Sequence, residues 1–255
     1  MTKFKILLTN IGYCTGLNGS LSDYVFKFYR YIYTSKKVQL DVLNKLSRIV
    51  NKEKLDLIVL IEIKKYQMEM LKRIISNDKN NNKYNLFEVE NKYSLKSLLR
   101  KILFIKNNCN GFIAKKNLKF EKHYLENGTK KLLYEIKLPN DTVLVATHFS
   151  LNKKTRKKQF DEISEKFKSK KMIVCGDFNI FDGFDELNSI MEKCELKIAN
   201  DKPTFPSNLC CSSKKSNNRK KALDLFLCSE KMKVNVKIIK DDFSDHMPIL
   251  LEIEL

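Results

Sequence analysis

Polar side chains that can bind a cation or move a proton follow several apolar runs of this sequence. A carboxamide, Asn10, and a carboxylate, Glu62, each come directly after such a run, and His148 ends another. The polar residues at two further run boundaries are Asp177, Asn179, Asp245 and His246. Carboxylate and amide oxygens suit a hard divalent cation, for which Mg²⁺ is the usual choice. The pattern therefore predicts a metal site with histidines beside it.

The elements that must position these side chains are strands that alternate with helices. Strand-like runs occupy residues 4–9, 57–61, 111–114, 132–138, 142–146, 172–175, 222–228, 234–239 and 249–255. Helical spacing of apolar residues occurs in 40–50, 95–103, 160–167 and 184–191. This alternation predicts a mixed α/β layered domain. Because the ends of several strands converge on one crevice in such domains, we expect the polar residues to meet there.

Six motifs in a fixed order resemble the endonuclease/exonuclease/phosphatase superfamily, which includes deoxyribonuclease I. They are TNIG around Asn10, DLIVLIEIK around Glu62, ATHFSLN around His148, VCGDFNI around Asp177 and Asn179, ALDLFLCS around Asp224, and FSDHMPI around Asp245 and His246. The motifs span residues 4–255. The resemblance implies one domain, residues 1–255, with a deoxyribonuclease I-like α/β fold. In that fold, a two-layer β-sandwich of mixed sheets is flanked by helices and carries its site at one edge.

The resemblance also implies a metal side of the site. Glu62 resembles the principal metal-ligating glutamate of the family. Asp245 and Asn10 resemble its supporting metal-side groups. The implied cofactor is Mg²⁺, with Mn²⁺ as the alternative.

The other motif residues resemble the catalytic groups of the family. His246 is similar to its general base or nucleophile-orienting histidine, and Asp224 is similar to the aspartate that fixes the tautomer of that histidine. Asp177 and Asn179 resemble the pair that positions the attacking water and the phosphoryl oxygens. His148 resembles a donor to the phosphate. The substrate implied is an anionic phosphate ester.

The sequence departs from the family pattern at three places. Ile61 stands where most members carry glutamine before the metal glutamate, and Gly12 stands where many abasic-site nucleases carry an acidic residue. The tyrosine or arginine that usually contacts the phosphate is not identified; Tyr93 is a candidate, and an ordinary loop tyrosine is the alternative. His123 lies in no motif and is interpreted as a surface or packing histidine.

The charge of the chain is strongly positive. Lys and Arg number 49 against 30 Asp and Glu, a net charge of +19, but 43 of the basic residues are lysine. The excess fits either a biased genome composition or a polyanionic partner. Basic runs at 153–158 (KKTRKK) and 214–221 (KKSNNRKK) adjoin the motifs. They predict either a rim that follows a phosphate backbone or solvated lysines.

Two further segments bear on the substrate. The aromatic run 24–33 suits base stacking or membrane contact, but a buried helix face is the commoner use of such a run. The basic amphipathic stretch 94–106 suits an acidic membrane, but we expect an ordinary surface helix that packs its leucines on the domain.

The favoured function is a Mg²⁺-dependent phosphodiesterase or endonuclease that acts on nucleic acid without strong sequence specificity. The alternatives are a phospholipid or phosphoinositide hydrolase with peripheral membrane contact, and an inactive binding module that uses the same cleft. No apolar run approaches the roughly 20 residues of a membrane span, and no signal peptide is evident, so we expect a cytoplasmic protein with reduced cysteines. The sequence leaves the oligomeric state open.

Overall fold

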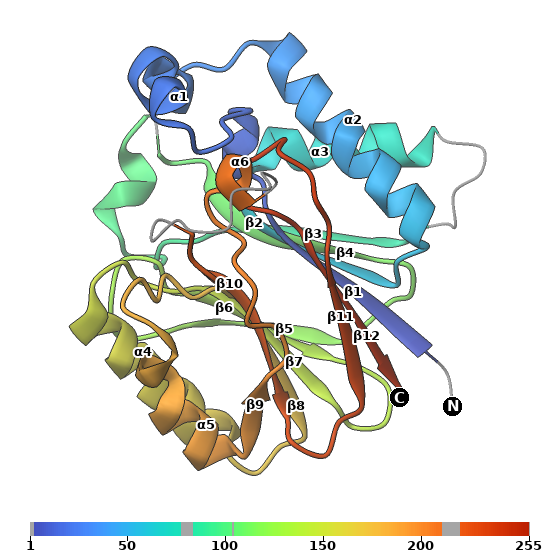
Figure 1. Cartoon of the computed structure of the whole chain (residues 1–255), viewed down its shortest axis with the longest axis vertical. Coiled ribbons are helices and arrows are strands. Elements are labelled where there is room, and N and C mark those ends of the chain that lie inside the picture. The colour runs from blue at the N-terminus through green and yellow to red at the C-terminus, as the bar shows by residue number, and fades with distance from the viewer. Residues whose placement is uncertain (1–2, 78–83, 104, 211–219, 255) are drawn as a thin grey trace.

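Two six-stranded sheets pack face to face, and helices cover their outer surfaces (Figure 1). The computed structural model describes residues 3–77, 84–103, 105–210 and 220–254. The first sheet has the order β11 (Val234–Ile238), β12 (Ile249–Glu254), β1 (Lys3–Asn10), β2 (Leu57–Lys64), β4 (Asn108–Ala114) and β3 (Leu86–Asn91). The second has the order β5 (Phe120–Tyr124), β6 (Leu132–Lys137), β7 (Val143–His148), β8 (Met172–Asp177), β10 (Asp224–Ser229) and β9 (Leu196–Ile198). The two-layer sandwich of mixed sheets predicted from the sequence is confirmed.

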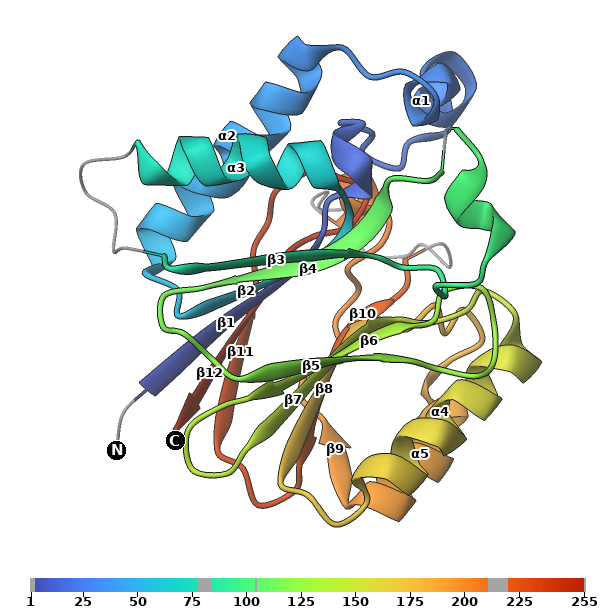
Figure 2. The ribbon, with the colours of Figure 1, turned by 180° about the vertical axis from the view of Figure 1, so that it is seen from behind.

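Each sheet carries its own pair of helices, as both views of the chain show (Figure 2). α2 (Lys36–Glu53) and α3 (Lys65–Ser76) cover the first sheet, and α4 (Lys153–Phe167) and α5 (Asn188–Cys194) cover the second. The short elements are α1 (Leu21–Phe26), α6 (Ser207–Cys210) and the 3-10 turns η1 (Gly12–Cys14), η2 (Phe28–Tyr31), η3 (Leu98–Lys101) and η4 (Phe184–Leu187).

The strands are apolar on both faces because both faces are covered. In β2, Leu57 and Val59 pack in the core between the sheets, whereas Ile58 and Leu60 pack against the helix layer of the first sheet. Burying one such side chain stabilises the fold by about 1.5–3 kcal/mol. The apolar runs of the sequence therefore mark strands sandwiched between two layers.

Two parallel strand pairs bring the ends of both sheets to the same end of the sandwich. β1 and β2 are parallel and joined through α2; β7 and β8 are parallel and joined through α4. Both crossover helices begin at a side-chain cap. The Ser35 hydroxyl accepts a hydrogen bond from the Val38 amide, and the Asn152 side chain accepts one from the Thr155 amide. The carboxyl-terminal parts of these four strands consequently carry Asn10, Glu62, His148 and Asp177.

Two expectations about helices are wrong. Residues 95–103 form only the four-residue turn η3, and Leu95, Leu98 and Leu103 are exposed rather than packed on the domain. The aromatic run 24–33 contains the end of α1 and all of η2, and Phe26 and Tyr29 in these elements are exposed instead of forming a buried helix face. Both segments border the strand ends, so an apolar helix face there has no sheet to cover it.

One residue of the basic run at 153–158 has a structural role. Arg156 is buried and donates through Nε to Glu186 at 3.1 Å. Its Nη1 atom donates to the carbonyl oxygens of Ser150 at 2.9 Å and Leu151 at 3.1 Å. Arg156 thereby ties α4 to the loop that follows His148, and it is not available to a ligand. The second run, 214–221, lies mostly outside the described residues.

We expect Arg156→Ala to lower the free energy of unfolding by about 3–5 kcal/mol, because it leaves the Glu186 carboxylate buried without its partner. Urea denaturation measures the change. Lys157→Ala, at an exposed neighbour in the same helix, is the matched control and should stay within about 0.5 kcal/mol of wild type. Equal stabilities of the two variants would contradict a structural role for Arg156.

Candidate active site

Asp177 lies at the centre of the polar cluster because strand register places it there. It is the last residue of β8, with His148 of β7 opposite on one side and Asp224 of β10 opposite on the other. The preceding residue, Gly176, has a φ of +150°, and a Cβ there would lie 1.7 Å from the Thr147 carbonyl oxygen. Only glycine allows this close approach of the two strands. Three sequence motifs thus meet at one point of the second sheet.

Both carboxylate oxygens of Asp177 are held by hydrogen bonds. The Asn10 side-chain amide of the first sheet donates to Oδ2 at 3.1 Å, and the Asn179 backbone amide donates to Oδ1 at 3.1 Å. His148 Nε2 lies 3.4 Å from Oδ2. Asn179 has a left-handed φ of 53°, and its side chain donates to the Phe149 carbonyl. The two sheets are therefore joined by a direct contact at the site.

His246 and Asp224 form a buried pair beside Asp177. His246 Nδ1 lies 2.7 Å from Asp224 Oδ2, and the Thr204 hydroxyl donates to the same oxygen at 2.8 Å. Burial alone would lower the pKa of His246, but the attraction of Asp224 outweighs it and raises the pKa to about 10. Burial raises the pKa of Asp177 to about 6; the negative charge of Asp224 adds to this effect, and His246 opposes it.

The ligand atoms of Asp177, Asp224 and His246 lie within 4.8 Å of one another, close enough to share a metal ion. His246 Nδ1 is already engaged with Asp224, however, and the raised pKa keeps the imidazole protonated. A protonated imidazole has no lone pair to offer a metal. With His246 in this state, the trio is arranged to exchange a proton, and Glu62 and Asp245 are the further carboxylates of the site.

Glu62 leaves its sheet at an irregularity between β2 and β4. The pairing register shifts between Leu60 and Ile63, and Glu62 has a left-handed φ of 58°. Its Oε1 atom accepts a hydrogen bond from the Tyr13 hydroxyl at 3.3 Å and lies 3.1 Å from the Lys92 ammonium. Burial would raise the pKa of Glu62, but the positive charge of Lys92 lowers it, so the carboxylate is ionised.

Asp245 stands opposite, in the turn before β12. The Tyr24 hydroxyl donates to its Oδ2 at 2.8 Å, and the Ser244 hydroxyl donates to its Oδ1 at 3.2 Å. Burial raises its pKa, and the nearby charge of Glu62 contributes to the increase. Gly12 stands where many abasic-site nucleases carry an acidic residue. A Cβ at this position would lie 3.3 Å from Asp245 Oδ1, which is a tight contact. At the second departure from the family pattern, Ile61 stands in place of glutamine, and its side chain packs in the core between the sheets.

Two lysines at the site, the buried Lys92 and the partly buried Lys130, could not be singled out from the sequence. The Lys92 ammonium donates to Glu62 and to the Tyr13 hydroxyl, and the Lys130 ammonium donates to His148 Nε2. Burial lowers the pKa of Lys130 to about 8, and the positive charge of Lys92 contributes. In a chain with 43 lysines, neither residue carries a signal of its own; Lys92 adjoins Tyr93, the residue that the sequence singled out.

Backbone contacts hold the two lysine-bearing segments together. The amides of Lys131 and Leu132 donate to the Lys92 carbonyl at 2.8 and 3.2 Å, and Tyr93 forms an antiparallel bridge with Lys130. Lys92 follows β3 of the first sheet and Lys130 precedes β6 of the second. The segments therefore form a bridge between the sheets at the site.

His148 is a neutral imidazole with one unused nitrogen. Burial lowers its pKa well below the usual value, and the positive charges of Lys130 and Lys92 add to the effect. Because Lys130 donates to Nε2, the ring proton lies on Nδ1. That atom is buried without a hydrogen-bond partner, 3.8 Å from Glu62 Oε1. His123 lies instead on β5, where it contacts Glu135 at 3.0 Å.

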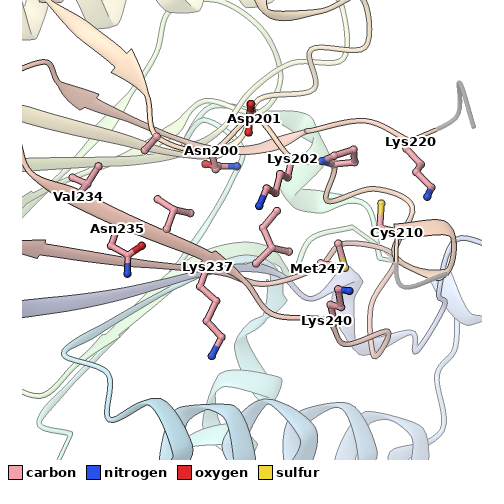
Figure 3. A pocket seen from close by; sticks show the side chains of 14 residues that line it. Asn200, Asp201, Lys202, Cys210, Lys220, Val234, Asn235, Lys237, Lys240 and Met247 are labelled. Carbon is pink, nitrogen blue, oxygen red and sulfur yellow. The ribbon is translucent and has the colours of Figure 1, made fainter. Parts of the chain in front are cut away.

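A groove of about 650 Å³ lies beside the polar cluster, between the 199–203 connection and β11. Figure 3 shows Asn200, Asp201 and Lys202 on one side and the side chains of Val234, Asn235 and Lys237 on the other. Of the eight residues predicted for the site, none lines the described part of this groove. The chemistry predicted from the sequence is therefore centred on the strand ends and not in this cavity.

Comparisons with known proteins agree with the family resemblance of the sequence motifs. Residues 141–250 match a family model described as endonuclease-reverse transcriptase. No curated protein matches the chain. An endonuclease/exonuclease/phosphatase family protein from Leptotrichia buccalis C-1013-b has a similar structure, with a TM-score of 0.68 and 17% identity, over 99% of this chain and 100% of the other.

Two further structures of the same fold have named ligands or substrates. TDP2 from D. rerio, in complex with a single-stranded DNA product, matches with a TM-score of 0.66 and 16% identity over 100% of both chains. A mannosyl-6-phosphatase from Bacteroides thetaiotaomicron matches with a TM-score of 0.67 and 13% identity, over 99% of this chain and 100% of the other. The resemblance found in the sequence is confirmed, and the chain has the fold of the endonuclease/exonuclease/phosphatase superfamily of phosphoric ester hydrolases.

Proposed function

We propose that this protein is a Mg²⁺-dependent hydrolase of phosphate esters, with Mn²⁺ as an alternative ion, and that it cleaves phosphodiester bonds. The observation that carries the proposal is the position of Asp177 between the end of β1 and the His246–Asp224 pair. Strand register places it there, and Asn10, Asn179 and His148 are its polar neighbours. An ester hydrolase must neutralise the phosphate, orient a water and stabilise the developing charge, and the cluster offers a group for each task.

Asn10, Glu62 and Asp245 are the residues that we propose as metal ligands. The donor set is one carboxamide and two carboxylates, all oxygen ligands of the kind that Mg²⁺ prefers. Glu62 is ionised and partly exposed, so it is available to a cation. The negative charge of Glu62 contributes to the raised pKa of Asp245, and a divalent ion between them would relieve this repulsion. When bound, the ion supplies positive charge to a phosphoryl oxygen.

Four further groups suit an anionic phosphate. The ammonium groups of Lys92 and Lys130 supply positive charge, and the Nδ1–H of His148 is a donor without a partner. The imidazolium of His246 carries a proton on its second nitrogen that it can donate to a phosphoryl oxygen or to the leaving group. Donors fixed by packing need no reorganisation when charge develops on the substrate.

Asp177 is the group that we propose as acceptor of the proton from the attacking water. With a pKa near 6 it is largely ionised at neutral pH, yet basic enough to accept a proton. Hydrogen bonds from Asn10 and Asn179 fix its orientation. His246, held by Asp224, then serves as a cationic donor in preference to the general base that the resemblance suggested as one of its roles.

The described residues give less support for a nucleic-acid substrate than the basic runs of the sequence gave. Arg156 of the run 153–158 is used within the fold, Lys153 pairs with Asp182 at 2.9 Å, and most of the run 214–221 lies outside the described residues. The same fold occurs in proteins named for DNA and for a sugar phosphate, so it does not select a substrate. The combination of donors and an oriented carboxylate also argues against an inactive binding module.

We expect Asp177→Asn to lower kcat for hydrolysis of bis(p-nitrophenyl) phosphate with Mg²⁺ by at least about 100- to 1000-fold, because the water loses its proton acceptor. Steady-state kinetics measure the change, and EDTA should abolish the wild-type activity. Asp182→Asn, the same exchange at an exposed aspartate, is the matched control and should leave kcat unchanged. Undiminished activity in Asp177→Asn, or in EDTA, would refute the mechanism.

The Lys130 ammonium predicts a fall of kcat/KM at alkaline pH. Its pKa of about 8 means that it is charged below this pH and neutral above it, so the phosphate loses one positive neighbour as the pH rises through this value. In Lys130→Arg, which stays charged, we expect the fall to move to higher pH; in Lys130→Met we expect about 10²–10³-fold lower kcat/KM at neutral pH and no such fall. Identical pH profiles of kcat/KM for wild type and Lys130→Arg would exclude this role.

A further inference from the structure

Apolar side chains gather on the surface at one side of the candidate site. In the described residues, fourteen large hydrophobic side chains are exposed; seven of them lie in residues 21–33 and four in residues 95–103. Phe26 is 77% exposed and Leu98 is 73% exposed. We name the exposed apolar side chains of these two segments the apolar rim. A concentration of exposed apolar side chains of this kind often marks an interaction site.

The apolar rim is built onto the candidate site. Tyr24 of α1 donates its hydroxyl to Asp245, while its neighbours Val25 and Phe26 point to solvent. In the second segment, Arg100 Nε donates to the carbonyl of Tyr93, the residue after Lys92, at 3.1 Å. Figures 1 and 2 both draw η3 directly below α1, with the two segments on the same side of the sandwich. The apolar rim therefore lies beside the candidate site.

The charges of the apolar rim are positive. Residues 21–33 and 95–103 contain Lys27, Arg30, Lys96, Arg100 and Lys101. Their one acidic residue, Asp23, is buried and paired with Lys27 at 2.6 Å, and Arg100 is paired with Glu90 at 3.1 Å, so Arg30, Lys96 and Lys101 account for the net positive charge of the apolar rim. Aromatic and aliphatic side chains interleaved with Lys and Arg suit the interface of a membrane that contains anionic lipids. A second copy of the chain would bring like charges together, which disfavours self-association through this surface.

We propose that the apolar rim docks the protein on an anionic lipid surface, so that the substrate is the phosphate ester of a lipid headgroup. The inference rests on the proposed function for its chemistry and on the exposed side chains for its location. In the described residues, no helix has both the length and the apolar content that crossing a bilayer requires. Docking would be peripheral, with Phe26, Tyr29 and Leu98 entering the interface and the basic side chains contacting lipid phosphates.

The test is co-sedimentation of the full chain with vesicles of phosphatidylcholine alone and of phosphatidylcholine mixed with phosphatidylglycerol. We expect binding to the mixed vesicles, and a loss of about tenfold or more in the partition coefficient for Val25→Ser/Phe26→Ser and for Leu98→Ser/Leu103→Ser. Leu151→Ser/Tyr66→Ser, at exposed apolar positions outside the apolar rim, is the matched control and should bind like wild type. All the substitutions are at exposed positions, and thermal unfolding checks that each variant folds.

Activity assays distinguish failure of this inference from failure of the proposed function. With the soluble bis(p-nitrophenyl) phosphate, the apolar-rim variants should retain wild-type kcat/KM, whereas their hydrolysis of phosphatidylglycerol in vesicles should fall in parallel with binding. Vesicle binding without hydrolysis of any ester would leave docking established and refute the proposed chemistry. Soluble hydrolysis without vesicle binding, equal binding by the serine variants, or oligothymidylate binding that replaces vesicle binding would each overturn the lipid proposal.

Discussion

Four carboxylates converge at one end of the sandwich, and the site depends on the cations that hold them there. Asp177 and Asp224 are buried, Glu62 and Asp245 are partly exposed, and their repulsion is visible in the raised pKa values of Asp177 and Asp245. Charges taken out of water must be paired or they destabilise the fold. His246, which Asp224 holds protonated, and the two lysines Lys92 and Lys130 supply this compensation from inside the protein. The same balance leaves room for one more cation and for an anionic substrate.

The sequence could predict the residues whose position depends on strand ends. Asn10, His148 and Asp177 meet because parallel strands end at a common edge, and this consequence of topology can be derived from apolar runs alone. Lys92 and Lys130 could not be predicted, because they come from connections between strands whose path depends on the packing of the whole domain. The residues around each of the forty-three lysines do not indicate whether its side chain points into the site or to solvent.

The two incorrect helix expectations have a common physical cause. Periodic apolar residues indicate that one face of a segment avoids water, but they do not indicate what covers that face. For α2 and α4 the cover is a sheet of the same chain. For residues 21–33 and 95–103, the described chain provides no cover, and the same pattern becomes surface. A sequence pattern of this kind therefore identifies an interface without saying whether it is internal.

The bridge between Lys92 and the 130–132 segment affects which parts of the domain can change during evolution. Six of the eight predicted site residues lie in the part that matches the family model, 141–250, whereas Glu62, Lys92 and the two exposed segments lie before it. Because the Lys92 carbonyl accepts hydrogen bonds from the amides of Lys131 and Leu132, the segment that follows β3 of the first sheet is held in register with the segment that precedes β6 of the second. Substitutions in the exposed segments 21–33 and 95–103 can change what the protein meets at its surface while this junction between the sheets is kept. The surface beside the candidate site and the residues of the site can then evolve as separate traits of one domain.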